Sequence, residues 1–201
     1  MPARLILASA SPRRKELLDQ IGVDYEVYPV DIDENMRRDE GVVEFVQRLA
    51  AEKARAAYQR LSESNAEITC LGADTVVEIG GDALGKPENS TQAAQILARL
   101  SAKKHKVHTA IALKNDSCEL TDISTSTVEF AALTPQQIES YISTGEPMDK
   151  AGAYAIQGIA GQFVTRLDGS YSGVMGLPLY ETAKLLSHCG ISAVIKKSVE
   201  E

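Results

Sequence analysis

Tryptophan is absent from this sequence of 201 residues, and only 5% of its residues are aromatic. Proteins that bind single-stranded nucleic acids stack the bases on aromatic side chains, so this scarcity argues against that class. Long apolar runs are missing too, since no window approaches the roughly 18 apolar residues of a membrane span. The apolar run near the start, Leu5–Ala8, is shorter than a signal peptide requires. We therefore expect a soluble protein without a membrane partner.

Cysteine is also scarce, and the three residues Cys70, Cys118 and Cys189 lie far apart in the sequence. Their odd number and the lack of a Cys-X-X-Cys spacing provide no disulfide framework. Free cysteines are typical of proteins in a reducing compartment, so we expect a cytoplasmic location.

A positive net charge is the third feature that the sequence lacks. The 21 lysines and arginines are outnumbered by 28 aspartates and glutamates, which gives a formal net charge of −7. Proteins that bind long nucleic acids present a basic surface, so this balance argues against a nucleic-acid partner. It leaves room for one small anionic ligand in a pocket that is locally basic.

Apolar runs and helical patterns alternate along the chain, and 44% of the residues are hydrophobic, which suits one domain of ordinary size. Strands are predicted at 5–8, 25–30, 68–73, 76–79, 83–84, 107–113, 123–130, 163–167 and 194–195. Helices are predicted at 13–21, 42–61, 91–100, 134–145 and 178–189. This order favours an α/β fold with a mixed sheet. The middle third reads as β-hairpins, which suggests two lobes on a shared sheet and a ligand in the cleft between them.

The first candidate functional stretch runs from Ser9 to Lys15 and reads Ser-Ala-Ser-Pro-Arg-Arg-Lys. It opens a predicted helix. A helix N-terminus offers free N–H groups and the positive end of the helix dipole, so it favours anions. Three cations at that point are locally unfavourable, and a bound polyphosphate would remove the conflict. The alternative is a solvated turn with surface cations.

Asp74 is the second candidate, because it follows the predicted buried strand 68–73. The ends of such strands are where α/β proteins place ligand sites. A carboxylate at that place can hold a divalent metal or act as a general base toward water. An aspartate that only caps a turn is the alternative.

Two glycine-containing stretches add further candidates. Gly80 and Gly85-Lys86 nearly match a phosphate-binding P-loop, but Pro87 stands where the magnesium-binding hydroxyl belongs, so we reject that motif. Lys86 can still reach a phosphate. The bare backbone of residues 149–158 permits the close approach of a ligand, and Gln157 offers a donor and an acceptor to a base edge. A tightly packed turn is the alternative here.

Other polar residues give weaker signals. His105 and His108 begin a predicted strand, where a spacing of three places them on opposite faces, so we expect structural roles. No Ser-His-Asp or Cys-His triad can be assembled. Glu34 and Glu52-Lys53 are charged candidates that spacing alone does not distinguish from surface charges.

Taken in this order, the motifs resemble those of the Maf family of nucleoside triphosphate pyrophosphatases, from Leu5 to about His188. The resemblance rests on residues 9–14, 72–77, 85–87, 149–154, 156–158 and 174–178. It implies one domain over residues 1–201, with a curved mixed sheet in two lobes, flanking helices and a cleft between the lobes, similar to inosine triphosphate pyrophosphatases. It also implies a homodimer, and hydrolysis of a nucleoside triphosphate to the monophosphate and pyrophosphate with a divalent cation, Mg²⁺ or Mn²⁺.

The resemblance further implies residue roles. Asp74 becomes the proton acceptor, and the other implied catalytic residues are Lys53, Lys86 and Arg13. The metal would be held by Glu34 and Asp74. The implied phosphate-binding residues are Ser9, Arg13, Arg14 and Lys86. Substrate choice would depend on Arg13, Thr75 and Gln157.

The substrate implied by the resemblance depends on one short pattern. Family members with Ile-Gln-Gly, as in Ile156-Gln157-Gly158, resemble dTTP/UTP pyrophosphatases, whereas a sister group with Glu before the last Gly acts on 7-methyl-GTP. We therefore expect a pyrimidine nucleotide such as dTTP or UTP. Two alternatives remain open: a 7-methyl-GTP pyrophosphatase, and a nucleotide-binding regulator of cell division without significant turnover.

Overall fold

The computed structural model describes residues 4–62 and 67–193. Its strands are β1 (Arg4–Leu7), β2 (Tyr25–Val27), β3 (Ile68–Ile79), β4 (Asp82–Leu84), β5 (Lys104–Lys114), β6 (Glu119–Phe130) and β7 (Val164–Asp168). Its α-helices are α1 (Pro12–Gln20), α2 (Val42–Leu61), α3 (Ser90–Leu100), α4 (Pro135–Ser143), α5 (Tyr171–Met175) and α6 (Leu179–His188). Short 3₁₀ helices are η2 (Glu146–Asp149), η3 (Ala151–Ala153) and η4 (Ile159–Phe163). The strand predicted at 194–195 lies outside the described residues.

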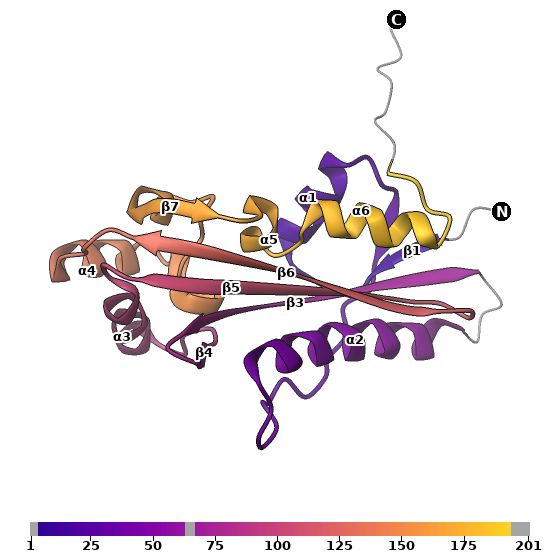
Figure 1. The fold of residues 1–201 in the computed structure, drawn as a ribbon, viewed down its shortest axis with the longest axis horizontal. Coiled ribbons are helices and arrows are strands. Elements are labelled where there is room, and N and C mark those ends of the chain that lie inside the picture. The colour runs from indigo at the N-terminus through magenta and orange to yellow at the C-terminus, as the bar shows by residue number, and fades with distance from the viewer. Residues whose placement is uncertain (1–3, 63–66, 194–201) are drawn as a thin grey trace, which may run out of the picture.

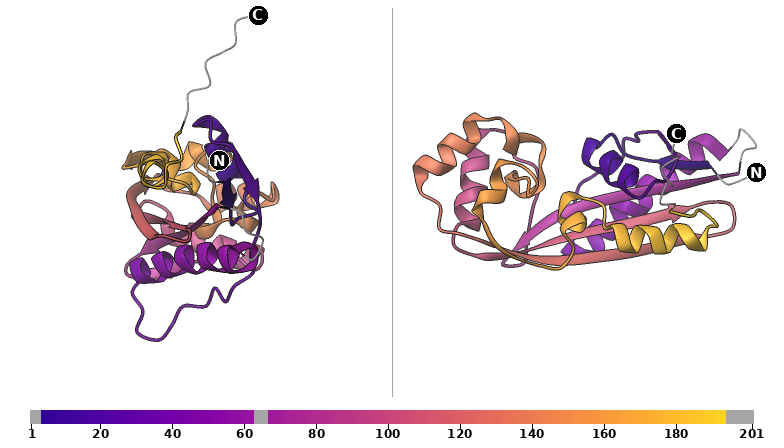
Figure 2. Two further views of the ribbon diagram at one scale, coloured as in Figure 1. Left: turned by 90° about the vertical axis from the view of Figure 1, so that its right-hand side faces the viewer. Right: turned by 90° about the horizontal axis from the view of Figure 1, so that it is seen from above.

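The strands form one mixed sheet in the order β2-β1-β3-β5-β6-β7, and β4 pairs with β3. The pairs β2–β1 and β1–β3 are parallel, and the remaining pairs are antiparallel. The long strands β3, β5 and β6 run the length of the molecule, and helices gather at both ends of them (Figures 1 and 2). The predicted α/β fold, a curved mixed sheet in two lobes with flanking helices, is confirmed.

Each lobe has its own apolar core. In one lobe, α3 and α4 pack on the sheet through Leu97, Leu100, Phe130, Tyr141 and Phe163. In the other lobe, α1 and α6 cover one face of the sheet through Leu7, Leu17, Leu18, Leu71 and Leu186. On its opposite face, α2 packs through the small residues Val46, Ala50, Ala54, Val76 and Ala110. Between the lobes the sheet is continuous, so the lobes share one scaffold.

The prediction that a strand ends before Asp74 is wrong, because β3 continues to Ile79. On one side, β5 pairs with it without interruption from Cys70 to Glu78. On the other side, β1 pairs only with residues 68–71 and β4 only with residues 77–79. Within the described residues, no strand therefore pairs with that edge of β3 between 72 and 76. Asp74 therefore lies at this opening in the sheet edge, and not at the end of a strand.

Side chains cap the N-termini of two helices, α3 and α4. The N-cap of α3 is Asn89, whose side chain accepts a hydrogen bond from the Gln92 N–H at 2.9 Å. In α4, Thr134 and Gln137 form a capping box. None of the helices in the described part of the chain combines the length and the apolar character that crossing a membrane requires.

Candidate active site

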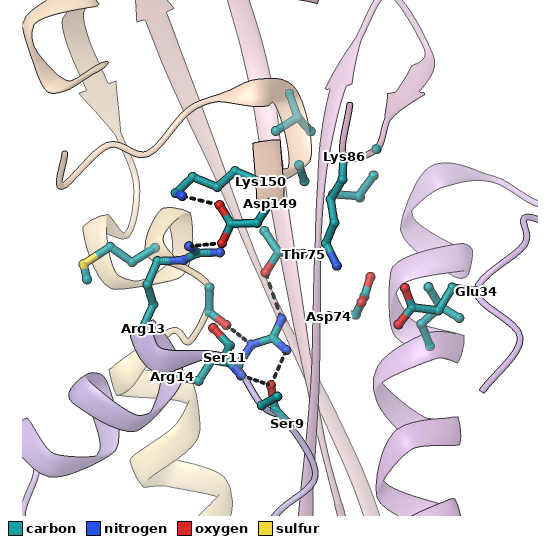
Figure 3. Close-up of a pocket in the computed structure, with 18 of the residues that line it drawn as sticks. Ser9, Ser11, Arg13, Arg14, Glu34, Asp74, Thr75, Lys86, Asp149 and Lys150 are labelled. Atoms are coloured by element: carbon teal, nitrogen blue, oxygen red, sulfur yellow. Dashed lines mark hydrogen bonds and ion pairs between the residues drawn. The ribbon is translucent and has the colours of Figure 1, made fainter. Parts of the chain in front are cut away.

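A pocket of about 870 Å³ lies at the opening in the sheet edge, between the two lobes (Figure 3). The loop after β1 and the loop after β4 flank the unpaired stretch of β3, and residues of both loops line the pocket. The structure brings every predicted site residue into the lining of this pocket: Ser9, Arg13, Arg14, Glu34, Lys53, Asp74, Thr75, Lys86 and Gln157. Their roles stay predictions, while their common location is a property of the fold.

Alternation along β3 sends neighbouring side chains to opposite faces of the sheet. Asp74 is directed toward α2, where its Oδ1 accepts a hydrogen bond from Lys53 Nζ at 2.8 Å. Thr75 faces the other side, where its Oγ1 lies 2.9 Å from Thr109 Oγ1 and 3.4 Å from Arg14 Nη2. The pocket is therefore reached by side chains from both faces of one strand.

The absence of a side chain at Gly72 sets the distance between α2 and β3. A Cβ atom at this position would lie 2.6 Å from the Ala54 backbone nitrogen, and closer still to the Ala50 carbonyl oxygen. Only glycine allows the helix backbone to lie directly on the strand. This close packing carries Lys53, on the same helix, to Asp74, which is two residues further along the strand.

Lys53 is a buried lysine that joins two carboxylates. Its Nζ lies 2.8 Å from Asp74 Oδ1 and 2.6 Å from Glu34 Oε1, and only 8% of the residue is exposed. Burial raises the pKa of Glu34, but the hydrogen bond and the charge of Lys53, with the charges of Lys86 and Arg14, outweigh burial and lower the pKa. Glu34 is therefore held ionised in a cationic environment.

Arg48 fixes the loop that carries Glu34. Its guanidinium pairs with both carboxylate oxygens of Glu40, at 2.6 and 2.8 Å, and with Glu52 at 3.1 Å. It also donates to the carbonyl oxygen of Asn35, the residue after Glu34, at 3.0 Å. The hydrogen bond from Arg48 lowers the pKa of Glu40 to about 2, so the pair stays charged at any ordinary pH. The loop is thus fastened to α2 next to the residue that enters the pocket.

Arg14 lies on the opposite wall and has three partners. Its Nε donates to the Gly176 carbonyl at 2.9 Å, its Nη1 donates to Ser9 Oγ at 3.1 Å, and its Nη2 approaches Thr75. Burial lowers its pKa, and the charge of Asp74 opposes this effect while the charge of Arg13 adds to it. Arg14 therefore joins the loop after β1 to β3 and to the turn before α6, and it places a fixed positive charge beside Asp74.

Arg13 reaches across the pocket to the other lobe (Figure 3). Its Nη1 lies 3.6 Å from Asp149 Oδ2, and Asp149 also pairs with Lys150. The first turn of α1 contains no acidic residue, and its N-cap Ser11 makes no side-chain cap bond. The start of α1 therefore keeps the anion-favouring character that the sequence predicts.

Lys86 adds a further positive charge to the pocket lining. It is exposed, it follows β4, and its side chain points toward Asp74 and Glu34 (Figure 3). Gln157 is also exposed; it lines the pocket and lies between η3 and η4. The cations and the two carboxylates thus gather at the opening in β3, while Gln157 is presented by the other lobe.

A family model described as Maf-like protein matches residues 4–189. The chain belongs to the Maf family. The resemblance seen in its sequence motifs is thereby confirmed.

Relatives of this Maf chain cover nearly its whole length. It is 50% identical over 189 residues to the dTTP/UTP pyrophosphatase of Methylobacillus flagellatus, with 94% of each chain covered. It is 52% identical to the dTTP/UTP pyrophosphatase of Pseudoalteromonas atlantica, with 94% of this chain and 98% of that one covered. Among solved structures, it is similar to the Ham1 protein of Staphylococcus aureus, with 16% identity, a TM-score of 0.48, and coverage of 80% of this chain and 90% of that one.

The oxygen atoms in the pocket of this Maf chain suit a hard divalent cation. In the described part of the chain, no three His, Cys, Asp or Glu side chains come together as a metal cluster. Glu34 and Asp74 nevertheless converge on one Lys53 Nζ atom. Mg²⁺ is commonly held by one or two carboxylates together with substrate phosphates, so this pair fits a metal that arrives with a polyphosphate.

Sequence reasoning missed two residues that hold the site together, Arg48 and Glu146. Arg48 sits in the charged pattern of α2, where it looks like any solvated arginine. Glu146 lies three residues before Asp149, outside the candidate ligand-binding stretch 149–158. Neither residue lines the pocket. Their importance is visible only in the structure, where Arg48 contacts the loop that carries Glu34 and Glu146 contacts the segment next to Gln157.

Proposed function

We propose that this chain hydrolyses dTTP and UTP to the corresponding monophosphate and pyrophosphate. Relatives that share about half of its residues are named dTTP/UTP pyrophosphatase, which supports this substrate class. The structural observation that carries the proposal is the Asp74–Lys53 pair in a pocket also lined by Arg13, Arg14 and Lys86. A carboxylate surrounded by cations suits the attack of water on a polyphosphate.

Charge is the main barrier to this reaction, because the negative phosphate oxygens repel a nucleophile. Arg13, Arg14 and Lys86 would offset this charge, and fixed cations stabilise the charge that develops on the leaving pyrophosphate. Ser9, whose hydroxyl already accepts a hydrogen bond from Arg14, would bind a phosphate oxygen beside it. Arg13 would exchange Asp149 for a phosphate when the substrate enters.

Asp74 would act as the proton acceptor. A water molecule attacks the α-phosphorus, the bond to the pyrophosphate oxygen breaks, and the proton of the water passes to the Asp74 carboxylate. Lys53 fixes the orientation of this carboxylate through the contact with Oδ1. A positioned general base of this kind contributes about 10²- to 10⁴-fold to a rate.

A divalent cation, Mg²⁺ or Mn²⁺, would be held by Glu34 and Asp74. When bound, it would supply positive charge to the phosphate oxygens as a Lewis acid. Lys53 would then keep the two carboxylates together by its contacts with both.

Substrate choice would depend on Gln157, Thr75 and Arg13. The Gln157 amide offers a donor and an acceptor, which together can read the edge of a pyrimidine base. Thr75 is held in place by Thr109 and Arg14 in the middle of β3.

Pyrophosphate release across a panel of nucleotides tests the proposal. The chain is incubated with each nucleotide and a divalent metal, and the pyrophosphate is converted to phosphate and measured. We expect the highest kcat/KM for dTTP and UTP. Faster hydrolysis of 7-methyl-GTP would move the chain to that sister activity. Tight binding without turnover of any nucleotide would favour a regulator of cell division instead.

We also propose that the chain works as a cytoplasmic homodimer without a nucleic-acid partner. The net charge of −7 supports the absence of a nucleic-acid partner, because it disfavours a polyanion over the whole surface. Sedimentation of the purified chain at several concentrations, with and without DNA, tests the dimer and the absence of that partner. A monomer at all concentrations would overturn the dimer, and co-sedimentation with DNA would show a nucleic-acid partner.

A further inference from the structure

Glu146 is a half-buried carboxylate outside the pocket lining that contacts the segment next to Gln157. It is the first residue of η2, while the segment, residues 157–160, consists of the two residues before η4 and the first two residues of η4. One oxygen of its carboxylate accepts a hydrogen bond from the Ile159 N–H at 3.0 Å. The other oxygen accepts from the Ala160 N–H at 3.3 Å and from the Tyr141 hydroxyl at 2.8 Å. Both backbone donors therefore lie within three residues of Gln157.

Gly158 makes this contact possible. A Cβ atom at position 158 would lie 2.6 Å from the Glu146 Cδ, so a larger residue there would displace the carboxylate from its present place. The carboxylate thus rests directly against the backbone of the residue that follows Gln157. A contact of this closeness leaves the segment little freedom, because moving it would break two hydrogen bonds to an ionised acceptor.

The backbone of Glu146 is also linked, through two intervening residues, to Arg13, another residue expected to determine substrate choice. Its carbonyl oxygen accepts a hydrogen bond from Lys150 Nζ at 2.8 Å. Lys150 pairs with Asp149, and Asp149 pairs with Arg13. The side chain of Glu146 therefore holds the Gln157 segment, and its backbone anchors the chain of contacts that ends at Arg13.

We propose that Glu146 is the positioning residue for substrate selection. Its carboxylate holds the segment 157–160 in the conformation in which the Gln157 amide meets the base. This inference rests on the proposed pyrimidine triphosphate substrate, and it adds a residue that does not touch that substrate. Catalysis at Asp74 and Lys53 lies in the other lobe and does not pass through Glu146.

The substitution Glu146→Gln tests this role with little change of shape. Its amide keeps one acceptor oxygen, but its NH₂ group faces a backbone N–H, so one donor stays unpaired. We expect KM for UTP to rise about tenfold, since a lost hydrogen bond to a charged group costs about that much, while kcat stays within about twofold. The preference for UTP over 7-methyl-GTP should fall with it. Glu139→Gln, an exposed residue of α4, is the matched control.

A double substitution separates positioning from a general structural role. In a Gln157→Ala background, Glu146→Gln should change selectivity no further, because both changes act through the same amide. Tyr141→Phe removes one donor to Glu146 and leaves its ring against Phe163, so it should shift KM in the same direction by less. This second variant keeps the test decisive if Glu146→Gln fails to fold.

The failure of this inference and that of the proposed function look different. If the wild-type chain hydrolyses neither dTTP nor UTP, the proposed function falls, and the inference falls with it. If the wild-type chain is active but the Glu146→Gln variant keeps its KM and selectivity, only the positioning role is overturned. A uniform loss of kcat for every nucleotide, or additive effects in the double variant, would also overturn it.

A separate observation concerns two cysteines at the far end of the sheet from η2. Cys118 lies in the turn between β5 and β6, and Cys189 follows the last residue of α6. Their Sγ atoms are 3.6 Å apart although 71 residues separate them in the sequence. Both are partly exposed, whereas Cys70 is fully buried. Asn115 Oδ1 accepts from the backbone N–H groups of Ser117 and Cys118, both at 2.9 Å, which fixes the turn.

We infer that Cys118 and Cys189 form a reversible disulfide when the chain meets a peroxide. The two thiols lose two protons and two electrons to make the S–S bond, and one hydrogen peroxide takes these up and becomes two waters. Burial and the hydrogen bond with Cys118 raise the pKa of the Cys189 thiol. The bond would join α6 to the β5–β6 hairpin, away from the pocket.

Mass spectrometry of the peroxide-treated chain tests this site. We expect a loss of mass equal to two hydrogen atoms, reversal by dithiothreitol, and a cross-linked peptide that contains Cys118 and Cys189. The variant Cys118→Ser should lose the cross-link, and Cys70→Ser should keep it. Disulfides between chains, or separate sulfinic acids on the two residues without a cross-link, would overturn the inference.

Discussion

Asp74 and Lys53 come from elements that are far apart in the sequence, yet they form one buried ion pair. Each residue is only 8% exposed, so neither charge is screened well by water. Removing Lys53 would leave Asp74 buried without its hydrogen-bonded partner, whereas removing the charge of Asp74 leaves Lys53 paired with Glu34, so the choice of substitution is important.

Replacing Asp74 by Asn keeps the shape of the side chain and removes the proton acceptor. We expect kcat for dTTP to fall by about 10²- to 10⁴-fold, the usual contribution of a general base, while nucleotide binding changes little. Single-turnover pyrophosphate release and equilibrium binding of a labelled nucleotide measure the two effects. Asp82→Asn, which removes an exposed carboxylate paired with Arg99, serves as control. Near-normal release by the Asp74→Asn variant would sink the assignment of Asp74.

The sequence predicted individual site residues better than it predicted their contacts. Arg13, Arg14 and Asp74 could be selected because their local patterns are unusual, with cations at a helix start and an acid after apolar residues. Lys53 and Glu34 were candidates that spacing did not distinguish from ordinary surface charges, and only the family resemblance gave them roles. Lys53 meets Asp74 because α2 packs closely on β3, and it meets Glu34 because the loop before α2 returns to the helix; no local pattern encodes either contact.

At the scale of elements, Gly72 shows how one residue sets the position of a whole helix. Gly72→Ala forces a Cβ atom into the backbone of α2, so the helix must move away from β3. We expect a loss of stability of about 1–3 kcal/mol, the usual cost of overpacking, together with reduced activity because Lys53 moves with the helix.

Thermal unfolding and pyrophosphate release of the Gly72→Ala variant check both parts. Gly85→Ala is the stability control, because a Cβ atom at position 85 would meet open space. An unchanged melting temperature for Gly72→Ala would show that α2 does not need its close contact with the strand.

Arg48 controls the loop between β2 and α2 and so the position of Glu34. Arg48→Ala removes the bond to the Asn35 carbonyl and the pair with Glu40. We expect the metal concentration at half-maximal rate to rise about tenfold or more, as for other residues that orient a metal ligand.

Initial rates measured over a range of MgCl₂ concentrations check this prediction. Arg55→Ala is a control on the same helix, since Arg55 pairs with Glu119 on the outer surface. A lower melting temperature with an unchanged metal requirement would contradict the role of Arg48.

Helix boundaries were predicted well where local chemistry determines them. Residues 42–61 form α2 as predicted, because strong helix formers fill it and Gly41 precedes it. The capping box of α4 acts within four residues and was also readable. The course of β3 was not readable, because Asp74 and Thr75 interrupt the apolar pattern of a strand that β5 supports over its whole middle. Strand pairing is non-local, so its information lies outside any window of sequence.

At the scale of the whole molecule, β3, β5 and β6 run through both lobes (Figure 1). We propose that residues 1–201 form a single domain, since neither lobe has a sheet of its own. The Arg13–Asp149 pair adds a contact between the lobes across the pocket.

A single cooperative transition is the expected outcome of thermal unfolding. Calorimetry should give an enthalpy that equals the van't Hoff value from circular dichroism, as for two-state domains. Two resolved transitions would show that the lobes unfold separately and would contradict the single domain.

The opening along β3 has one more consequence. In an intact sheet, a neighbouring strand would take up the main-chain groups that face this edge between residues 72 and 76, but no strand of the described chain does so. We expect a nucleotide in the pocket to meet main-chain amide and carbonyl groups of residues 74–76, which line the pocket and which β5 supports from behind. Recognition through main-chain groups would be retained when side chains change, so Gln157, Thr75 and Arg13 could be altered without removing it. Amide hydrogen exchange along β3 would reveal this recognition as protection that appears when nucleotide is added and is retained in side-chain variants.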